Sequence, residues 1–239
     1  MEKYQKLKKI IEESKKIVVF TGAGISVPSG IPDFRSDNGL YNQGDYIRPE
    51  EIISHSFFVR YPKQFYEFYG NKMVYKDAKP NLAHTYFGNL ANVSAVVTQN
   101  IDNLHQLGGS KVVYELHGSV KRNYCIKCHK YYDLEEINPK EIPYCDCGGI
   151  IKPDVVLYEE PLDTKVVMKA VNAIAEADTM IVIGTSLVVY PAASYLNYFK
   201  GQNLILINKS KTSYDGIADL VFNEDVIEVI KKIKDPSMC

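Results

Sequence analysis

Residues 17–35 read Ile17-Val18-Val19-Phe20-Thr21-Gly22-Ala23-Gly24-Ile25-Ser26-Val27-Pro28-Ser29-Gly30-Ile31-Pro32-Asp33-Phe34-Arg35. The apolar run at the start has no polar alternation, which is typical of a strand buried on both faces of a parallel sheet. Gly22 and Gly24 then form a turn in which backbone N–H groups can approach a pyrophosphate at the start of a helix, where the helix dipole also favours anions. We therefore predict a nucleotide-binding turn, with a glycine turn that only ends the strand as the alternative.

The same turn departs from the fingerprint of dinucleotide-binding dehydrogenases. The fingerprint G-x-G-x-x-G needs a third glycine where this chain has Val27. It also needs a ribose-binding acid about 20 residues further on, after a second strand. Here Asp33, Phe34 and Arg35 follow within a turn or two instead. The sequence thus favours a bound nucleotide and argues against hydride transfer.

Strand candidates and helical patterns alternate along the chain, which favours an α/β fold with a Rossmann-like parallel sheet. The strand candidates are residues 17–20, 95–98, 112–116, 180–183, 204–207 and 220–222, and helical patterns cover 165–177, 191–199 and 225–233, after an amphipathic N-terminal helix. Two stretches break the rhythm: residues 36–80 are rich in aromatic side chains, and residues 121–152 hold a cysteine cluster. We therefore predict a nucleotide-binding domain of residues 1–35, 81–120 and 153–239, with a helical insert at 36–80 and a zinc-binding insert at 121–152.

The composition limits the possible partners. The 239 residues include 28 basic and 29 acidic side chains, so the formal charge of −1 gives no indication of nucleic-acid or membrane-surface binding. Every apolar stretch is shorter than the roughly 18 residues of a membrane span, and no signal peptide is recognisable. We expect a cytoplasmic protein with no direct nucleic-acid partner and no membrane partner.

Four of the five cysteines lie close together in the sequence. Cys125-x2-Cys128 and Cys145-x-Cys147 are separated by 16 residues, close to the spacing of a zinc ribbon. Four thiolate ligands without an open position favour a structural Zn²⁺ ion. His129 directly follows Cys128 and is a competing candidate ligand. Without a metal, the cysteines would be buried unligated thiols or a redox pair.

Polar residues follow several strand candidates, at the sheet edge where open α/β folds bind ligands. Gln99-Asn100-Ile101-Asp102 follows one strand and could bind ribose hydroxyls and a carboxamide, with a capped Asx-type turn as the alternative. Gly184-Thr185-Ser186 follows another strand. His117 ends a third strand and is the candidate general base, because imidazole titrates near neutrality. His84 and His105 fall on expected helices, which favours packing or capping roles for them.

Taken together, these motifs resemble the sirtuin family of NAD-dependent protein lysine deacylases over nearly the whole chain. The matching segments are Gly22-Ala23-Gly24-Ile25-Ser26, Gly30-Ile31-Pro32-Asp33-Phe34-Arg35, Lys79-Pro80-Asn81-Leu82-Ala83-His84, Thr98-Gln99-Asn100-Ile101-Asp102, Leu116-His117-Gly118, the four clustered cysteines, and Gly184-Thr185-Ser186-Leu187-Val188-Val189-Tyr190-Pro191-Ala192.

The resemblance implies a transferase that consumes NAD and moves the acetyl group of acetyl-lysine to ADP-ribose, with release of nicotinamide and 2′-O-acetyl-ADP-ribose. It implies acetylated lysine peptides or proteins as partners, one structural zinc ion and a monomeric enzyme. By the same resemblance, His117 is the catalytic base and Phe34 shields the reacting sugar from water. The implied site residues are His117 and Asn100 for catalysis; Gly22, Ala23, Gly24, Ser26, Val27, Asp33, Phe34, Arg35, Gln99, Asn100, Ile101, Asp102, His117, Gly184, Thr185, Ser186, Asn208, Lys209, Asp225 and Val226 for NAD; Val155, Val156, Leu157, Tyr158, Val188 and Val189 for the peptide; and Cys125, Cys128, Cys145 and Cys147 for zinc.

Two departures from the family pattern concern specificity. Members usually carry Gly-Glu where this chain has Glu159-Glu160. Members that remove succinyl or malonyl groups carry Tyr-x-x-Arg in the helical insert, where this chain has Tyr66-Glu67-Phe68-Tyr69 and no arginine. The sequence therefore predicts deacetylation, extended to longer apolar acyl groups, over desuccinylation. Mono-ADP-ribosyl transfer is the alternative reaction, and a noncatalytic nucleotide sensor is the alternative class.

Overall fold

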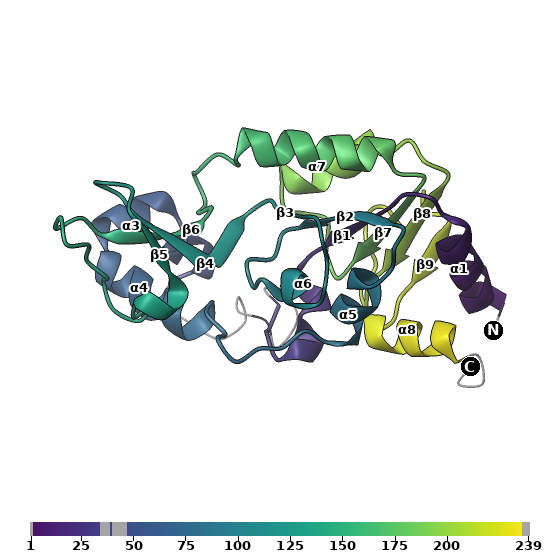
Figure 1. The fold of residues 1–239 in the computed structure, drawn as a ribbon, viewed down its shortest axis with the longest axis horizontal. Helices are drawn as coiled ribbons and strands as arrows, with labels where there is room; N and C mark the ends of the chain where they lie inside the picture. The colour runs from purple at the N-terminus through teal and green to yellow at the C-terminus, as the bar shows by residue number, and fades with distance from the viewer. Residues whose placement is uncertain (1, 34–38, 40–46, 236–239) are drawn as a thin grey trace.

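A six-stranded, all-parallel sheet forms the centre of the protein (Figure 1). The computed structural model describes residues 2–33, 39 and 47–235. The strands are β1 (Ile17–Thr21), β2 (Val93–Thr98), β3 (Val113–Glu115), β7 (Thr179–Ile183), β8 (Asn203–Ile207) and β9 (Leu220–Phe222). All six coincide with the strands predicted from the sequence, because continuous β-branched runs are a strong signal for buried parallel strands.

The order of the strands creates a switch point beside β1. The order is β3-β2-β1-β7-β8-β9. β2 and β3 lie on one side of β1, and the chain then returns to place β7, β8 and β9 on its other side. Connections leave the carboxyl ends of β1 and β7 in opposite directions, and open α/β sheets bind ligands in a crevice at such a switch point. Every predicted polar strand-end segment lies at this carboxyl edge of the sheet.

Helices cover both faces of the sheet. On one face lie α1 (Glu2–Glu13), α5 (Leu82–Gly88) and α8 (Val226–Lys234), and on the other lie α7 (Thr164–Glu176) and η5 (Ala192–Tyr198). The apolar stripe predicted for the N-terminal helix is confirmed, since Leu7 and Ile11 are both buried under it. The pattern at 191–199 forms a 3₁₀ helix rather than the expected α-helix, and its N-cap, Pro191, makes no side-chain capping bond.

The two inserts pack together as one body, which we call the small lobe. It contains α2 (Pro49–Ile52), α3 (His55–Arg60) and α4 (Pro62–Lys72), together with an antiparallel sheet in the order β5 (Tyr131–Asp133), β4 (Gly118–Cys125), β6 (Ile151–Val155), and a short turn η4 (Leu134–Glu136). Phe65 and Tyr66 from the helices share a core with Leu134 and Ile151 from the cysteine-containing segment. From the sequence we predicted two inserts but none of these three strands. Their residues mix polar and apolar side chains without the period of two that indicates a strand.

No helix in the described part of the chain is long and apolar enough to cross a bilayer.

Candidate functional site

The glycine turn after β1 packs directly against the turn after β7. The N–H groups of Gly22 and Gly24 donate to the carbonyls of Ile183 (3.0 Å) and Gly184 (2.8 Å). A Cβ on Gly24 would lie 2.6 Å from the Cα of Gly184, and one on Gly22 would lie 2.7 Å from the Cβ of Thr185. Gly184 itself has a φ of +61°. These glycines are therefore required by the close approach of two backbones at the switch point.

This contact corrects the reason that the sequence suggested for the glycines. The N–H groups of Gly22 and Gly24 are used inside the chain, so they are not the groups that could bind a pyrophosphate. The expected helix start is also different, because the turn continues into two 3₁₀ turns, η1 (Ala23–Ile25) and η2 (Val27–Ser29). Ala23 and Val27 lie on these turns, and Val27 is 36% exposed. The position of the turn at the sheet's switch point still matches a nucleotide site.

A hydrogen-bonded group of three side chains lies behind this turn. Ser26 donates its hydroxyl to the carboxylate of Asp102 (2.6 Å) and accepts from the side-chain amide of Asn100 (3.1 Å). Asp102 also accepts from the N–H of Leu104 (2.9 Å), the first residue of the short helix α6 (Leu104–Leu107). Burial is the main cause that raises the pKa of Asp102, and these two hydrogen bonds partly oppose it. The group presents an amide and an acid in fixed positions, as recognition of a carboxamide requires.

Two buried histidines support that group. His84 accepts from the backbone N–H of Asn81 at Nδ1 (3.2 Å), so its neutral ring carries the proton on Nε2, which lies 3.5 Å from the hydroxyl of Ser26. His105 lies 4.9 Å from His84 between ring centroids and contacts Thr21 through Nε2 (2.9 Å). Burial lowers the pKa of His84 to about 4 and that of His105 to about 3. The expected packing and capping roles are confirmed, whereas the contact with Ser26 had no signal in the sequence.

His117 has the geometry of a general base. It follows β3, and its Nδ1 lies 2.9 Å from the backbone carbonyl of Gln99, which can only accept a hydrogen bond. The neutral ring therefore carries its proton on Nδ1 and leaves Nε2 free to accept one. Burial lowers the pKa of His117, and the hydrogen bond to the carbonyl of Gln99 partly opposes that shift. Gln99 also donates its side-chain amide to Thr185 (3.0 Å) and so connects the turns after β2 and β7.

The remaining predicted cofactor residues lie along the same edge. Asn208 follows β8 and donates its amide to the carbonyl of Ser210 (2.7 Å), while Asp225 caps α8 and pairs with Lys209 (2.9 Å). The next residue, Val226, is the first residue of α8 and is buried. Among the other predicted residues, Ile101 accepts a hydrogen bond at its carbonyl from the N–H of Val120 (3.0 Å). Ser186 is exposed and Asp33 is partly buried. Phe34 and Arg35 lie outside the described residues.

The segment expected to bind a peptide is partly occupied by the small lobe. Tyr158 donates its N–H to the carbonyl of Ile53 (3.0 Å) and accepts from the N–H of His55 (3.0 Å), and Val156 donates to the carbonyl of His117 (3.0 Å). Val155 and Leu157 are buried, with exposures of 4% and 3%, whereas Val188 is 54% exposed and Val189 is partly buried. Tyr158 therefore has no main-chain group left for strand pairing with a ligand.

The four clustered cysteines fit a zinc ion. Their sulfur atoms all lie within 4.8 Å of one another, with Cys125 and Cys147 at 3.4 Å and Cys128 and Cys145 at 3.6 Å. A tetrahedral site with Zn–S bonds of about 2.3 Å places its sulfurs about 3.8 Å apart. None of the four thiols forms a disulfide, and His129 is not part of the cluster. The ligand set predicted from the sequence is thus the one that the structure brings together.

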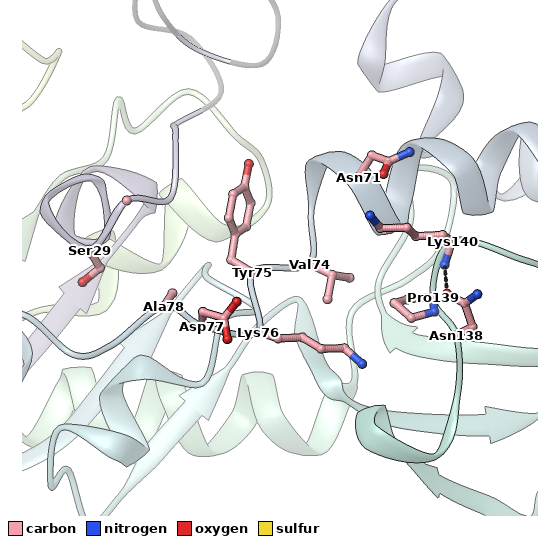
Figure 2. Close-up of a pocket in the computed structure, with 12 residues that line it drawn as sticks. Ser29, Asn71, Val74, Tyr75, Lys76, Asp77, Ala78, Asn138, Pro139 and Lys140 are labelled. Atoms are coloured by element: carbon pink, nitrogen blue, oxygen red, sulfur yellow. Dashed lines mark hydrogen bonds between the residues drawn. The ribbon is translucent and has the colours of Figure 1, made fainter.

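A cavity of about 640 Å³ lies at the junction of the small lobe and the turn after β1 (Figure 2). It is lined by Ser29, Gly30, Gly70, Asn71, Val74, Tyr75, Lys76, Asp77, Ala78, Asn138, Pro139 and Lys140. None of the polar side chains at the carboxyl ends of β2, β3 or β7 reaches it. The cavity contains none of the predicted site residues, and no motif in the sequence indicated it.

Comparison with known proteins identifies a family. Residues 22–191 match the Sir2 family. The chain is 56% identical to an NAD-dependent protein deacetylase of Clostridium perfringens, covering 98% of this chain and 99% of that one, and 45% identical to one of Staphylococcus aureus, covering 95% and 96%. Among solved structures, it resembles Sir2 with a p53 peptide and NAD⁺ (39% identity, TM-score 0.85, covering 99% and 100%) and Sir2 bound to an acetylated peptide (37% identity, TM-score 0.85, covering 99% and 100%).

Proposed function

The chain belongs to the Sir2 family, and on that premise we propose that it is an NAD-dependent protein lysine deacetylase. The observation that carries this proposal is the placement of His117 beside the Ser26, Asn100 and Asp102 group at the switch point of the sheet. A base with one free nitrogen and a fixed carboxamide-binding group are what such a reaction needs in one crevice. NAD supplies the ribose that accepts the acetyl group and the nicotinamide that leaves.

His117 is the proposed base of the reaction. Its Nδ1 proton is held by the carbonyl of Gln99, so Nε2 accepts the proton of a ribose hydroxyl during acetyl transfer. A base whose pKa lies below its ordinary value is already neutral at the working pH and needs no prior deprotonation. Gln99 orients this ring through its backbone and binds Thr185 through its side chain.

The proposed NAD site extends along the carboxyl edge of the sheet. Asn100 and Asp102 bind the carboxamide of nicotinamide, because Ser26 holds both side chains in place. At the other end, Thr185 and Asn208 follow β7 and β8 and bind the ADP-ribose part. Gly22, Gly24 and Gly184 belong to the proposed NAD site through the close packing of the two turns, and not through N–H groups that donate to a phosphate. The further residues proposed for NAD are Ala23, Val27, Asp33, Phe34, Arg35, Gln99, Ile101, Ser186, Lys209, Asp225 and Val226.

We further propose that the acetylated peptide binds as an extended strand between residues 155–158 and the exposed segment around Val188, Val189 and Tyr190. Main-chain pairing of this kind accepts many sequences. The domain boundaries at 36–80 and 121–152, the monomeric state and a cytoplasmic location are part of the same proposal. Four reduced thiols in one metal site suit a reducing compartment. Size-exclusion chromatography with light scattering tests the monomer against a chain mass of 27.1 kDa.

The decisive experiment is incubation of the purified protein with NAD and an acetyl-lysine peptide, with both products followed by mass spectrometry. Deacetylation gives free lysine peptide and acetyl-ADP-ribose in equal amounts, whereas mono-ADP-ribosyl transfer adds ADP-ribose to protein. The variant His117→Gln should lose turnover, and His129→Gln, a histidine outside the crevice, should retain it. Absence of acetyl-ADP-ribose with a folded, zinc-loaded protein would refute the proposal.

Acyl preference is tested with matched acetyl, longer apolar acyl and succinyl peptides. Tyr66 and Tyr69 both lie in the core of the small lobe, and Tyr66 donates its hydroxyl to the carbonyl of Ile151 (2.6 Å). The helix that carries both tyrosines, α4, has no arginine to pair with a succinyl carboxylate. We expect turnover of the acetyl peptide to exceed that of the succinyl peptide, and equal rates would contradict the expectation.

A further inference from the structure

Glu159 has an unusual backbone conformation for its residue type. Its φ is +75°, in the left-handed region that glycine adopts freely and that is strained for other residues. Glu159 lies in the turn directly after Tyr158 and is exposed. A strained residue persists only where the surrounding contacts hold it, and such residues gather at binding sites.

Ser56 provides those contacts from the start of α3. Its backbone N–H and its hydroxyl both donate to the carboxylate of Glu159, each at 2.9 Å. The neighbouring Glu160 accepts from the N–H of Leu157 (2.9 Å) and pairs with Lys152 (3.1 Å). The turn is thereby fixed to the small lobe on both sides of Glu159.

The charge of Glu159 is not compensated within the described residues. Both of its donors come from the neutral Ser56, and no lysine or arginine of the described chain pairs with it. Glu160, by contrast, contacts both Lys152 and His55. Lys152 therefore compensates Glu160 and not Glu159. Each carboxylate oxygen of Glu159 retains a lone pair that can accept from a guanidinium or ammonium group.

The backbone of Glu159 is also available. Among the described residues, the main-chain groups of Tyr158 are taken by Ile53 and His55, while the N–H and carbonyl of Glu159 make no backbone hydrogen bond. A peptide strand that runs along residues 155–158 therefore finds no free main-chain group on Tyr158, and the backbone of Glu159 is its next contact. Its own side chains would then pass within reach of the uncompensated carboxylate.

We propose that Glu159 is a specificity-determining residue that selects substrates with an arginine or lysine close to the acetyl-lysine. The assignment rests on the proposed function, because it requires the acetylated peptide to bind along residues 155–158. Ser56 keeps the carboxylate facing the peptide by holding the strained turn in one conformation. The charge of Glu159, rather than its shape, carries the preference.

The test uses acetyl-lysine peptides that differ at one position. Arginine, glutamine or glutamate is placed in turn at each of the two positions on either side of the acetyl-lysine, and kcat/KM is measured from nicotinamide release at low salt. An exposed ion pair should favour arginine over glutamine by about two- to fivefold at one position and disfavour glutamate there. The preference should shrink at about 1 M salt, where the screening length is about 3 Å.

The variant Glu159→Gln keeps the size of the side chain and an acceptor for Ser56 but removes the charge. In this variant the ratio of kcat/KM for the arginine peptide to kcat/KM for the glutamine peptide should be close to one. Glu67→Gln, the same substitution at an exposed position of α4, is the control and should keep the wild-type ratio. Ser56→Ala should raise KM for every peptide while the ratio persists. Binding of the same peptides by fluorescence anisotropy gives the ratio independently of turnover.

An equal preference in wild type and Glu159→Gln, or no preference in wild type, would overturn the assignment of Glu159 alone. Failure of wild type to deacetylate any of these peptides would overturn the proposed function, and the assignment with it.

Discussion

Replacing Gly24 by alanine tests whether the glycine turn is required by the protein itself or by the nucleotide. The structure places a Cβ at this position 2.6 Å from the Cα of Gly184 and 2.9 Å from its carbonyl oxygen, and real Cβ atoms do not approach other atoms so closely. Both obstructing atoms belong to a backbone, so no side chain can rotate away. The turns after β1 and β7 must therefore separate.

The size of the effect follows from two opposing contributions. Overpacking a tight site costs about 1–3 kcal/mol. Alanine returns about 0.4–1 kcal/mol by restricting the unfolded chain. A net loss of about 1–2 kcal/mol corresponds to a fall of roughly 2–8 °C in the melting temperature of a chain of this size. The shift should be present without any ligand, since the contact is internal.

Thermal melts of the ligand-free protein measure the shift, and Gly216→Ala is the matched control. A Cβ on Gly216 meets nothing within 4 Å, so that variant should melt at or slightly above the wild-type temperature. NAD binding to each variant is measured in parallel. If Gly24→Ala melts like wild type and only its NAD affinity falls, the glycine serves ligand approach and our interpretation of the turn is refuted.

Three further outcomes follow from the site and the small lobe. His117→Gln should lower kcat by about 10²–10⁴-fold while retaining NAD binding. The kcat/KM of the wild type should stay level above neutral pH and fall only below about pH 6.5, because burial lowers the pKa of this base. A loss of activity that begins above pH 7 would contradict the role of His117 as a base of lowered pKa. Tyr66→Phe removes the hydroxyl that donates to the carbonyl of Ile151 and should cost about 1–3 kcal/mol by denaturant unfolding, and an unchanged midpoint would show that the hydrogen bond contributes nothing. His84 and His105 have folded-state pKa values of about 4 and about 3, below the unfolded value of about 6.5, so the unfolded chain binds more protons and the melting temperature should fall as pH decreases from 6.5 toward 4; a flat profile there would contradict their burial as neutral rings.

The sequence was most informative where one local signal sufficed. Continuous apolar runs predicted all six parallel strands, and cysteine spacing predicted the ligand set that the structure assembles. Contacts between distant segments were beyond such signals. Nothing local to Gly24 shows that Gly184 packs against it, and nothing near Ser26 indicates that His84 approaches its hydroxyl. The antiparallel sheet of the small lobe was missed because its strands show no clear period of two, and because its core is completed by helices from another part of the chain.

The small lobe and the reaction site are connected through the backbone at the start of β4. Strand β4 begins at Gly118, directly after His117, and pairs there with Val155, where β6 ends. Gly118 has a φ of +75°, and a side chain on it would collide with the carbonyl of Asp154. Only glycine therefore fits where β4 and β6 meet next to His117. The base and the peptide segment therefore both continue directly from strands that the metal stabilises.

We consequently expect that a chelator will release one equivalent of zinc and lower activity in parallel with unfolding of the small lobe, although no thiol lies at the reacting atoms. Cys125→Ser should reproduce the chelator's effect, because it removes one of the four ligands. Metal release, circular dichroism and nicotinamide formation are followed on one sample. Full activity after complete zinc release would show that the fold around His117 and Val155 holds without the metal, and the proposed coupling would be wrong.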